Sequence, residues 1–437
     1  MNFLLIQPLD YLFVSGGAHK ANRFLMEGLV QRGHKCIVLY PLEENREKNG
    51  KEKLLKQLEQ RQIQVVDASH PDMVHYHMNG VDVYASGGSL SFFTKLIHRI
   101  TNEFNIDWTI VTEDRSFLWV EVAHEANPGR AIFLSHSQAT LPFGPECFVD
   151  DPTKTRTLQQ MADLICVSEY LQRYAKEWGN LDSTVLRFPS YGTGPFPFLA
   201  NFDQGAVTMI NPSLLKGSPI FIELAQRMPE VQFAAVPTWS TTGKDRAILE
   251  ALPNVQFIQP SPDMNEVLKH VKVLLVPSLW GESFGQVVVD AMLRGIPVLA
   301  SDVGGLPEAK LGVEYLLPVT QIREYSSISA KVYTAIPVVP AQDVTPWETT
   351  LRRLLNDREH YNDLAQRSQA AALNFINNIG IEHFERYFLN LQPRQTSVVP
   401  SLTPDPKVQR AAQLAALPAE QRALLAQRLK QRRGEQV

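Results

Sequence analysis

The sequence alternates short apolar runs with amphipathic helical patterns along most of its 437 residues. This rhythm is typical of βαβ units, which build a parallel sheet covered by helices. It occurs in two successive sets, with strands predicted first at 3–7, 35–40, 64–66, 108–112 and 131–135, then at 207–210, 231–236, 255–258, 273–276, 298–300 and 315–317. A chain of this length normally forms more than one domain, so the pattern predicts an α/β protein with two Rossmann-like, doubly wound domains.

A stretch dense in Pro, Gly and aromatic residues separates the two sets. It reads FPSYGTGPFPFLANFDQ over residues 188–204, a composition typical of an interdomain linker. We therefore expect an N-terminal domain at 1–187 and a C-terminal domain at 205–375. A last helical pattern at 381–391 follows the second domain.

Residues 276–308 form the most informative stretch, VPSLWGESFGQVVVDAMLRGIPVLASDVGGLPE. A buried strand ends near Pro277, a glycine-bearing loop follows at 281–285, and a helix is predicted at 286–294. Gly295 and Pro297 then stop the helix before the next strand. Ligands of parallel sheets bind at the carboxyl ends of the strands, and a helix N-terminus there favours an anion such as a diphosphate.

This stretch closely resembles the signature of retaining glycosyltransferase family 4. The resemblance rests on Glu282 followed after seven residues by an acid, Asp290, on Phe284 and Gly285, and on GGLPE at 304–308. It implies the GT-B fold, with the nucleotide sugar on the second domain, the acceptor on the first, and a crossover helix at 376–391 returning to the first domain. It implies a metal-independent hexosyltransferase without a cofactor, whose donor substrate is a nucleotide diphosphate sugar. The alternative interpretation of the stretch is an ordinary Rossmann crossover with an acidic loop.

The resemblance also assigns individual residues. It gives catalytic roles to His136 and Glu282. It assigns donor binding to Gly16, Gly17, Asn211, Lys216, Ser283, Phe284, Gly285, Gln286 and Asp290. Lys216 lies between a strand and a helix, where its charge can neutralise a phosphate leaving group. Glu282 is expected to hold sugar hydroxyls, and Asp290 the ribose hydroxyls.

Two positions depart from the family pattern. Asn211 stands where the family has Arg, and Asp290 is one methylene shorter than the family's Glu. These departures leave open a catalytically degenerate binding partner, and a sugar-nucleotide epimerase is a second alternative. Lys216 can also be a surface lysine before a helix, and His136 a structural histidine. His19 and Glu113 are further candidates on the acceptor side.

Composition narrows the classes of partner. The net charge of −4 gives no reason to expect nucleic acid, and the sequence contains no P-loop, HExxH or metal-binding Asp-x-Asp motif. Three scattered cysteines, the lack of a signal-peptide pattern and the lack of a membrane-length apolar run favour a cytoplasmic protein. The sequence does not identify the acceptor, for which we consider a peptide or another secondary metabolite.

The C-terminal segment 392–437 differs in character from the rest. It contains eight Lys or Arg residues against three acids, and a basic amphipathic helix is predicted at 418–433 after a flexible linker. This helix resembles the linker helices that flank condensation domains in nonribosomal peptide synthetases, which implies docking to a protein partner. A solvated tail is the alternative.

Overall fold

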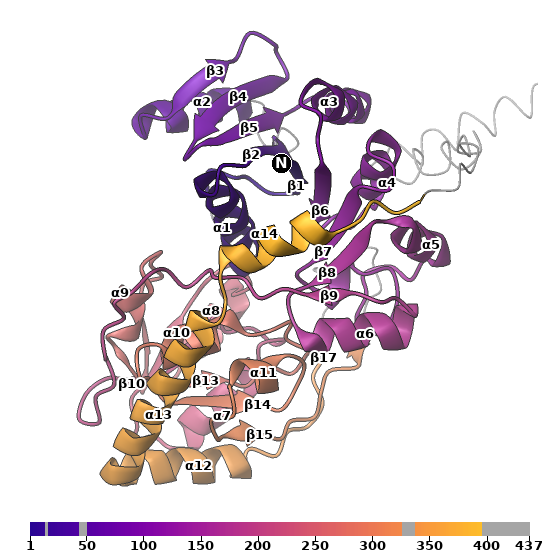
Figure 1. The fold of residues 1–437 in the computed structure, drawn as a ribbon. Helices are drawn as coiled ribbons and strands as arrows, with labels where there is room; N and C mark the ends of the chain where they lie inside the picture. Colours follow the sequence, from indigo (N-terminus) through magenta and orange to yellow (C-terminus); the bar gives the residue numbers. More distant parts are fainter. Residues whose placement is uncertain (14–15, 43–49, 326–336, 396–437) are drawn as a thin grey trace, which may run out of the picture. The chain divides into compact units, whose positions relative to one another are not determined.

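The computed structural model describes residues 1–13, 16–42, 50–325 and 337–395. Contacts divide the chain into a compact unit, Met1–Arg394, and a second unit, Gln395–Val437. The helix predicted at 418–433 and its docking role lie outside the described residues. Within the compact unit, the described strands form two large sheets and one small hairpin, and Figure 1 shows them with their covering helices.

The first sheet has nine strands in the order β3-β4-β5-β2-β1-β6-β7-β8-β9. Its strands are β1 (Asn2–Ile6), β2 (Lys35–Pro41), β3 (Gln64–Asp67), β4 (Met73–Met78), β5 (Val81–Ser86), β6 (Trp108–Thr112), β7 (Ala131–Ser135), β8 (Asp163–Cys166) and β9 (Thr184–Val185). Its helices are α1 (Gly17–Gln31), α2 (Gly50–Gln60), α3 (Leu90–Glu103), α4 (Leu118–Ala126), α5 (Pro152–Gln160) and α6 (Glu169–Gly179), with a 3₁₀ turn at Gln138–Thr140. The apolar runs of β1, β6 and β7 pair in parallel and are fully buried, as expected for central strands covered on both faces.

One edge of this sheet differs from an all-parallel arrangement. β3, β4 and β5 pair antiparallel, and the sequence rhythm predicted neither β4 nor β5. The β4–β5 turn consists of Asn79 and Gly80, both with positive φ, which is the signature of a tight hairpin. His75 Nε2 lies 3.1 Å from Asp82 Oδ1 across this hairpin, so the polar residues there pair with each other.

The second sheet has six parallel strands in the order β12-β11-β10-β13-β14-β15. Its strands are β10 (Ala206–Ile210), β11 (Phe233–Val236), β12 (Val255–Phe257), β13 (Val271–Val276), β14 (Val298–Ser301) and β15 (Leu316–Leu317), and the hairpin is β16 (Glu324–Tyr325) with β17 (Pro337–Val338). Its helices are α7 (Ser218–Arg227), α8 (Gly243–Glu250), α9 (Met264–Leu268), α10 (Gln286–Met292) and α11 (Leu306–Ala309). The chain reverses its direction of strand addition between β10 and β13, and this switch point is where ligands of such sheets bind.

Three helices end the compact unit. α12 (Thr345–Asn356) and α13 (Arg358–Asn377) pack on the core of the second sheet, which contains the fully buried Trp347. α14 (Ile381–Asn390) instead packs on the first, because Phe388 lies 4.9 Å from Phe3, ring centre to ring centre. α14 thus follows the second sheet in the chain but contacts the core of the first. The domain limits at 187 and 375 stay predictions, although the last strand of the first sheet ends at Val185 and the first strand of the second begins at Ala206.

Candidate active site

An ion pair between Glu282 and Lys216 lies at the carboxyl edge of the second sheet. Lys216 Nζ donates to Glu282 Oε1 at 2.6 Å, and Ser278 Oγ donates to the same oxygen at 2.6 Å. Burial raises the pKa of Glu282, but the positive charge and hydrogen bond of Lys216 outweigh it, so the pKa is lowered overall. Glu282 is therefore a carboxylate although its side chain is only 12% exposed.

Glycines allow the loops around this pair to approach each other closely. Gly217 has φ of 88°, and a Cβ there would lie 1.8 Å from the Pro277 carbonyl oxygen. The loop that carries Lys216 is thereby held against the end of β13. On the opposite side, a Cβ on Gly304 would lie 2.5 Å from the Glu282 backbone N and O, and Gly305 N donates to Glu282 O at 2.6 Å. The two glycines of the GGLPE sequence thus support the backbone of Glu282 directly.

The short helix α10 places Gln286 beside the first domain. α10 ends at Met292, two residues earlier than predicted, and Gly285 precedes it with φ of 98°. A Cβ on Gly17 would lie 2.8 Å from Gln286 Oε1, so the predicted donor residues of the two halves meet here. Gly16 begins α1 without a side-chain cap, and α1 has no acidic residue in its first turn. The N-terminus of α1 therefore lies next to Gln286, and a helix N-terminus is a place where anions bind favourably.

Asp290 is influenced by two cations that the sequence analysis did not assign. Arg294 Nη1 lies 3.4 Å from Asp290 Oδ1 and donates to the Asp290 carbonyl at 2.8 Å. Burial raises the pKa of Asp290, while the charges of Lys20 and Arg294 lower it in part. The i,i+4 spacing of Asp290 and Arg294 was the available sequence signal. Lys20 lies on α1, far from Asp290 in the sequence, so no sequence pattern indicated that its charge acts on Asp290.

Asn211, the other departure from the family pattern, makes local hydrogen bonds. Its φ is 61°, a left-handed conformation that Asn tolerates better than most residues. Its Oδ1 accepts from the Ser240 backbone N–H at 3.0 Å and from Ser240 Oγ at 2.8 Å. Asn211 therefore joins the loops after β10 and β11 and contributes no positive charge.

His136 lies at the carboxyl end of β7 in a buried hydrogen-bond chain. Its Nε2 is 2.7 Å from Asn22 Oδ1, and Asn22 Nδ2 donates to Gln7 Oε1 at 3.1 Å. Burial, with a smaller effect of His19, lowers the pKa of His136 to about 3. The imidazole is therefore neutral at physiological pH, and Nε2 carries the proton that Asn22 accepts.

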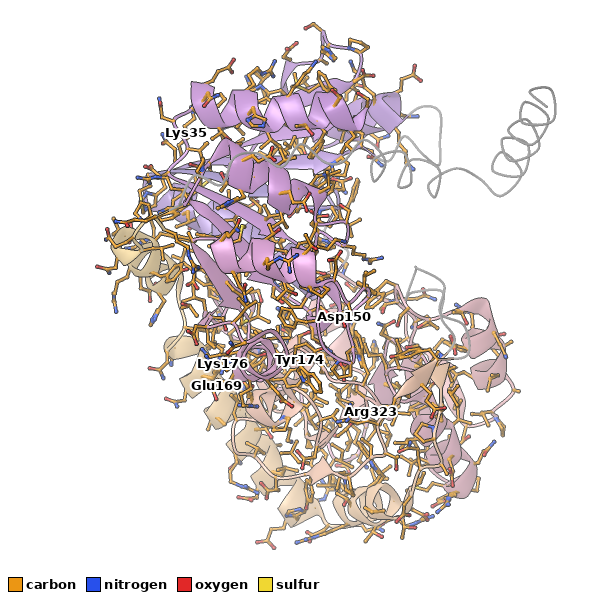
Figure 2. The ribbon with its side chains drawn as sticks, turned by 90° about the vertical axis from the view of Figure 1, so that its right-hand side faces the viewer. Lys35, Asp150, Glu169, Tyr174, Lys176 and Arg323 are labelled. Atoms are coloured by element: carbon orange, nitrogen blue, oxygen red, sulfur yellow. The ribbon has the colours of Figure 1, made fainter. Side chains whose placement is uncertain are left out.

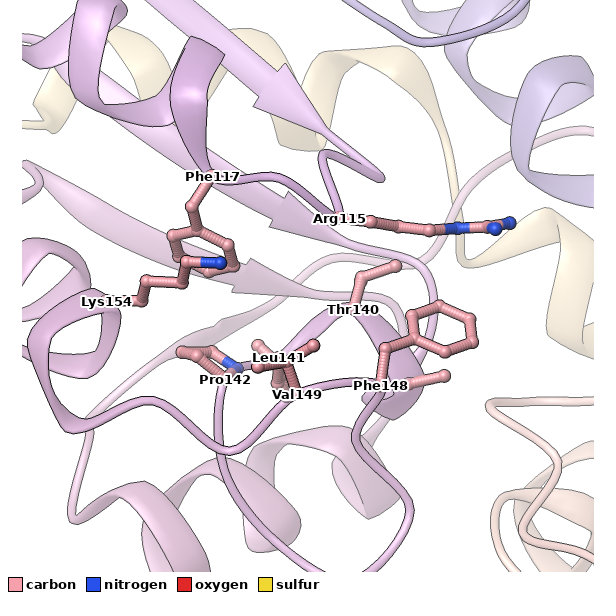
Figure 3. A pocket seen from close by; sticks show the side chains of 9 residues that line it. Arg115, Phe117, Thr140, Leu141, Pro142, Phe148, Val149 and Lys154 are labelled. Carbon is pink, nitrogen blue, oxygen red and sulfur yellow. The ribbon is translucent and has the colours of Figure 1, made fainter. Parts of the chain in front are cut away.

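Residues of the first domain also contact the Glu282 loop. Gln138 Nε2 donates to the Gly281 carbonyl and to Glu146, and Ser283 Oγ donates to Gln138 Oε1 at 3.2 Å. Sequence reasoning missed Gln138 and Glu146, because they lie more than 130 residues from the loop and belong to no motif. Loops after β6 and β7 form a small pocket next to this contact (Figure 3), lined by Arg115, Phe117, Ala139, Thr140, Leu141, Pro142, Phe148, Val149 and Lys154.

Glu308 makes a second contact between the domains. Its carboxylate accepts from the backbone N–H groups of Glu169 at 2.9 Å and Tyr170 at 2.5 Å, at the start of α6. Arg187 Nη2 lies 2.9 Å from Glu308 Oε2. Glu169, whose backbone N–H donates to Glu308, is labelled in Figure 2. A carboxylate at a helix N-terminus is favourable, so Glu308 links the second domain to the first.

Two further properties concern the described residues as a whole. Among them, no group of three or more His, Cys, Asp or Glu side chains could hold a metal ion. None of the described helices combines the length and apolar composition that a membrane crossing requires.

Comparison with known proteins decides the fold. Sucrose-phosphate synthase from Thermosynechococcus elongatus superposes with a TM-score of 0.62 at 16% identity, over 89% of this chain and 98% of that one. HepE from Anabaena, solved in complex with UDP and glucose, gives a TM-score of 0.59 at 16% identity with the same coverage. The chain has the GT-B fold of glycosyltransferases. Within this GT-B chain, residues 242–334 match the family model for glycosyl transferases group 1.

Relatives found by sequence match different shares of the chain. The D-inositol 3-phosphate glycosyltransferase of Nocardia farcinica is 32% identical over 124 residues, which are 28% of this chain and 23% of the relative. The matched segment thus spans about a quarter of that enzyme. An uncharacterized 42.6 kDa protein in the cps region of Klebsiella pneumoniae is 22% identical over 353 residues, which are 75% of this chain and 92% of that protein.

Proposed function

We propose that this protein is a retaining glycosyltransferase that moves a sugar from a nucleotide diphosphate sugar to a hydroxyl-bearing acceptor. The observation that carries the proposal is the Lys216–Glu282 pair, largely buried at the switch point of the second sheet. The bond to be broken joins the sugar to the diphosphate. The Glu282 carboxylate suits the sugar, and the Lys216 ammonium suits the diphosphate. The group 1 family match over 242–334 and the UDP complex of HepE support the same assignment.

In the proposed mechanism the residues position the donor and stabilise the leaving group. Lys216 has three N–H donors, so it can retain Glu282 and also bind a diphosphate oxygen. The N-terminus of α1 at Gly16 and Gly17 supplies further N–H groups to the diphosphate. Glu282 binds sugar hydroxyls and stabilises positive charge that develops on the sugar. These charges do the work that a divalent ion would do elsewhere, so we propose a metal-independent reaction.

Asn211 stands where the family has a positively charged Arg, and we propose that Lys20 on α1 supplies a positive charge instead. Lys20 lies one turn into this helix and acts electrostatically on Asp290. We assign Asp290 to the ribose hydroxyls, with Arg294 and Lys20 holding its orientation. Neutral His136, with Nε2 bonded to Asn22, is assigned to the face of the reacting sugar.

A second function stays open because of the same two residues. Asn211 is bonded to Ser240, and Asp290 already has a partner in Arg294. Both observations fit a GT-B protein that binds a nucleotide sugar without turning it over. The two functions share the site and differ only in catalysis.

Incubation of the purified full chain with UDP-glucose, GDP-mannose, ADP-glucose and TDP-glucose separates these functions. Slow release of nucleoside diphosphate from one donor, followed by mass spectrometry, is expected for a glycosyltransferase. Binding without release in every case would support the non-catalytic alternative. No binding of any donor would contradict both.

A further inference from the structure

Glu113 lies at the carboxyl end of β6, between two segments that contact the donor side. β6 is flanked in the sheet by β1 and β7. The segment after β1 brings Gly17 to Gln286, and the segment after β7 brings Gln138 to the Gly281 carbonyl. The strand order alone therefore places Glu113 at the part of the first domain that faces the Glu282 loop.

The backbone of Glu113 is strained. Its φ of 55° is left-handed, a conformation that is unfavourable for a residue other than glycine. Such strain persists only where the surroundings enforce it, and it concentrates at functional sites. Neither a hairpin turn nor a helix C-terminus accounts for it here, because Glu113 follows a central parallel strand.

The side chain of Glu113 has an oxygen that the described residues do not satisfy. Oε1 is shielded from solvent and accepts no hydrogen bond from them. Burial raises the pKa of Glu113 to about 7, although Arg115 and the His136 backbone N–H both lower it. The carboxyl group is thus held close to His136 while one acceptor position remains available. A buried acceptor without a donor is costly unless a ligand or solvent molecule uses it.

We propose that Glu113 Oε1 accepts a hydrogen bond from the attacking hydroxyl of the acceptor and so orients it toward the donor sugar. This inference rests on the proposed glycosyltransferase function and names the acceptor-binding group of the same site. The acceptor chemistry that fits is a neutral hydroxyl, because a carboxylate would be repelled.

The test uses water as the attacking hydroxyl, so the natural acceptor need not be known. Hydrolysis of whichever of the four donors is turned over is measured for the wild type, Glu113→Gln and Glu113→Gly. We expect kcat to fall about tenfold or more in both variants, while the KM for the donor changes less than twofold. Glu121→Gln is the control for loss of a carboxyl charge, because Glu121 is an exposed residue on the neighbouring helix α4, and it should leave both constants unchanged.

A pH profile and a stability measurement separate a functional role from a structural one. Wild-type kcat should fall as the pH drops below about 7, where Glu113 takes up a proton, and this limb should disappear in Glu113→Gln. Arg115 acts on Glu113 through its charge and His136 through its backbone N–H, and the His136 imidazole stays neutral throughout this range. Glu113→Gly relieves the strained φ, so its Tm should not fall.

Two results would overturn the inference, and they have different meanings. Equal hydrolysis rates and pH profiles in the wild type and in both variants would reject Glu113 alone. A lower Tm in both variants with an unchanged pH profile would show a structural carboxyl and also reject it. Absence of hydrolysis by the wild type with every donor would instead reject the proposed function, and the inference with it.

Discussion

At the scale of single residues, the Lys216–Glu282 pair adds little to stability beyond what apolar residues of similar size would give. Two charges held away from water lose solvation that their attraction repays only with good geometry, and apolar residues of similar size often do as well. The 2.6 Å contact and the Ser278 hydrogen bond supply that geometry. An ion pair kept in a largely buried position is therefore better explained by a ligand than by folding.

Glu282 and Asp290 should respond differently to loss of charge. Glu282→Gln keeps the size of the side chain but removes its charge near the reacting sugar, so kcat should fall about a hundredfold with little change in nucleotide affinity. Asp290→Asn should mainly weaken nucleotide binding, because a neutral amide is a poorer acceptor for ribose hydroxyls. Calorimetric titration of nucleoside diphosphate and steady-state kinetics measure both effects. The reverse pattern would show that the two roles are wrongly assigned.

His136 should make stability depend on pH. Its folded-state pKa of about 3 lies below the ordinary value of 6.5, so the unfolded chain binds the extra proton as the pH falls through 6.5. The free energy of unfolding should therefore decrease by about 2 kcal/mol between pH 7 and pH 5 from this residue alone. His136→Gln should lack this contribution in urea titrations at the two pH values. His383→Gln, an exposed control, should retain it, and an equal pH response of all three proteins would contradict the buried neutral imidazole.

The sequence singled out Glu282 and Lys216 separately, but it predicted neither the contact between them nor its surroundings. Glu282 and Lys216 follow from local motifs, and the structure brings them into contact across 66 positions. The partners of Asn211 and Asp290 depend on loop conformation and helix geometry that no motif records. Gln138 reaches Gly281 from 143 positions away, a contact that only the assembled fold reveals.

At the scale of secondary structure elements, the carboxyl-end loops of the second sheet act as one packed unit. A Cβ on Gly304 would meet the Glu282 backbone at 2.5 Å, so Gly304→Ala should displace that loop. We expect a loss of more than tenfold in donor turnover and about 2–4 kcal/mol in unfolding free energy. Gly312→Ala is a matched control, since Gly312 also has positive φ but nothing lies within 4 Å of its Cβ. Equal losses of turnover in both variants would show that strain, rather than the loop contact, is responsible.

The elements themselves were largely predictable, with two instructive exceptions. Buried parallel strands such as β6 and β7 have continuous apolar runs, and their predicted limits agree with the structure. β4 and β5 were missed because their polar residues obscure the strand pattern, although Asn79-Gly80 marks the turn. α4 was missed because it begins without a side-chain cap, after Phe117 with φ of 63°.

At the scale of the whole molecule, contacts between the domains involve the residues that carry the donor loop. The Glu308 carboxylate accepts hydrogen bonds from two backbone N–H groups at the start of α6, and a neutral side chain would be a weaker acceptor there. Glu308→Gln should lower the unfolding free energy by about 1–2 kcal/mol and slow donor turnover, because the two halves are held together less firmly.

Glu223→Gln is the control for this change, since Glu223 pairs with Arg227 on the exposed surface of one helix. It should change neither Tm nor turnover. If thermal unfolding and kinetics of Glu308→Gln match those of this control, the contact with α6 has no role in coupling the domains.

The most direct test of the central claim is a calorimetric titration of UDP, GDP, ADP and TDP into the wild type, Lys216→Ala and Lys269→Ala. Lys269 is an exposed lysine on the surface of the second domain, paired with Glu266, and serves as the charge control. We predict that one nucleoside diphosphate binds the wild type and Lys269→Ala with equal affinity and one-to-one stoichiometry. Lys216→Ala should bind it about ten- to a hundredfold more weakly, a loss of roughly 1.5–3 kcal/mol. Failure of all four to bind the wild type, or equal affinity in Lys216→Ala, would contradict a nucleotide sugar site at the Lys216–Glu282 pair.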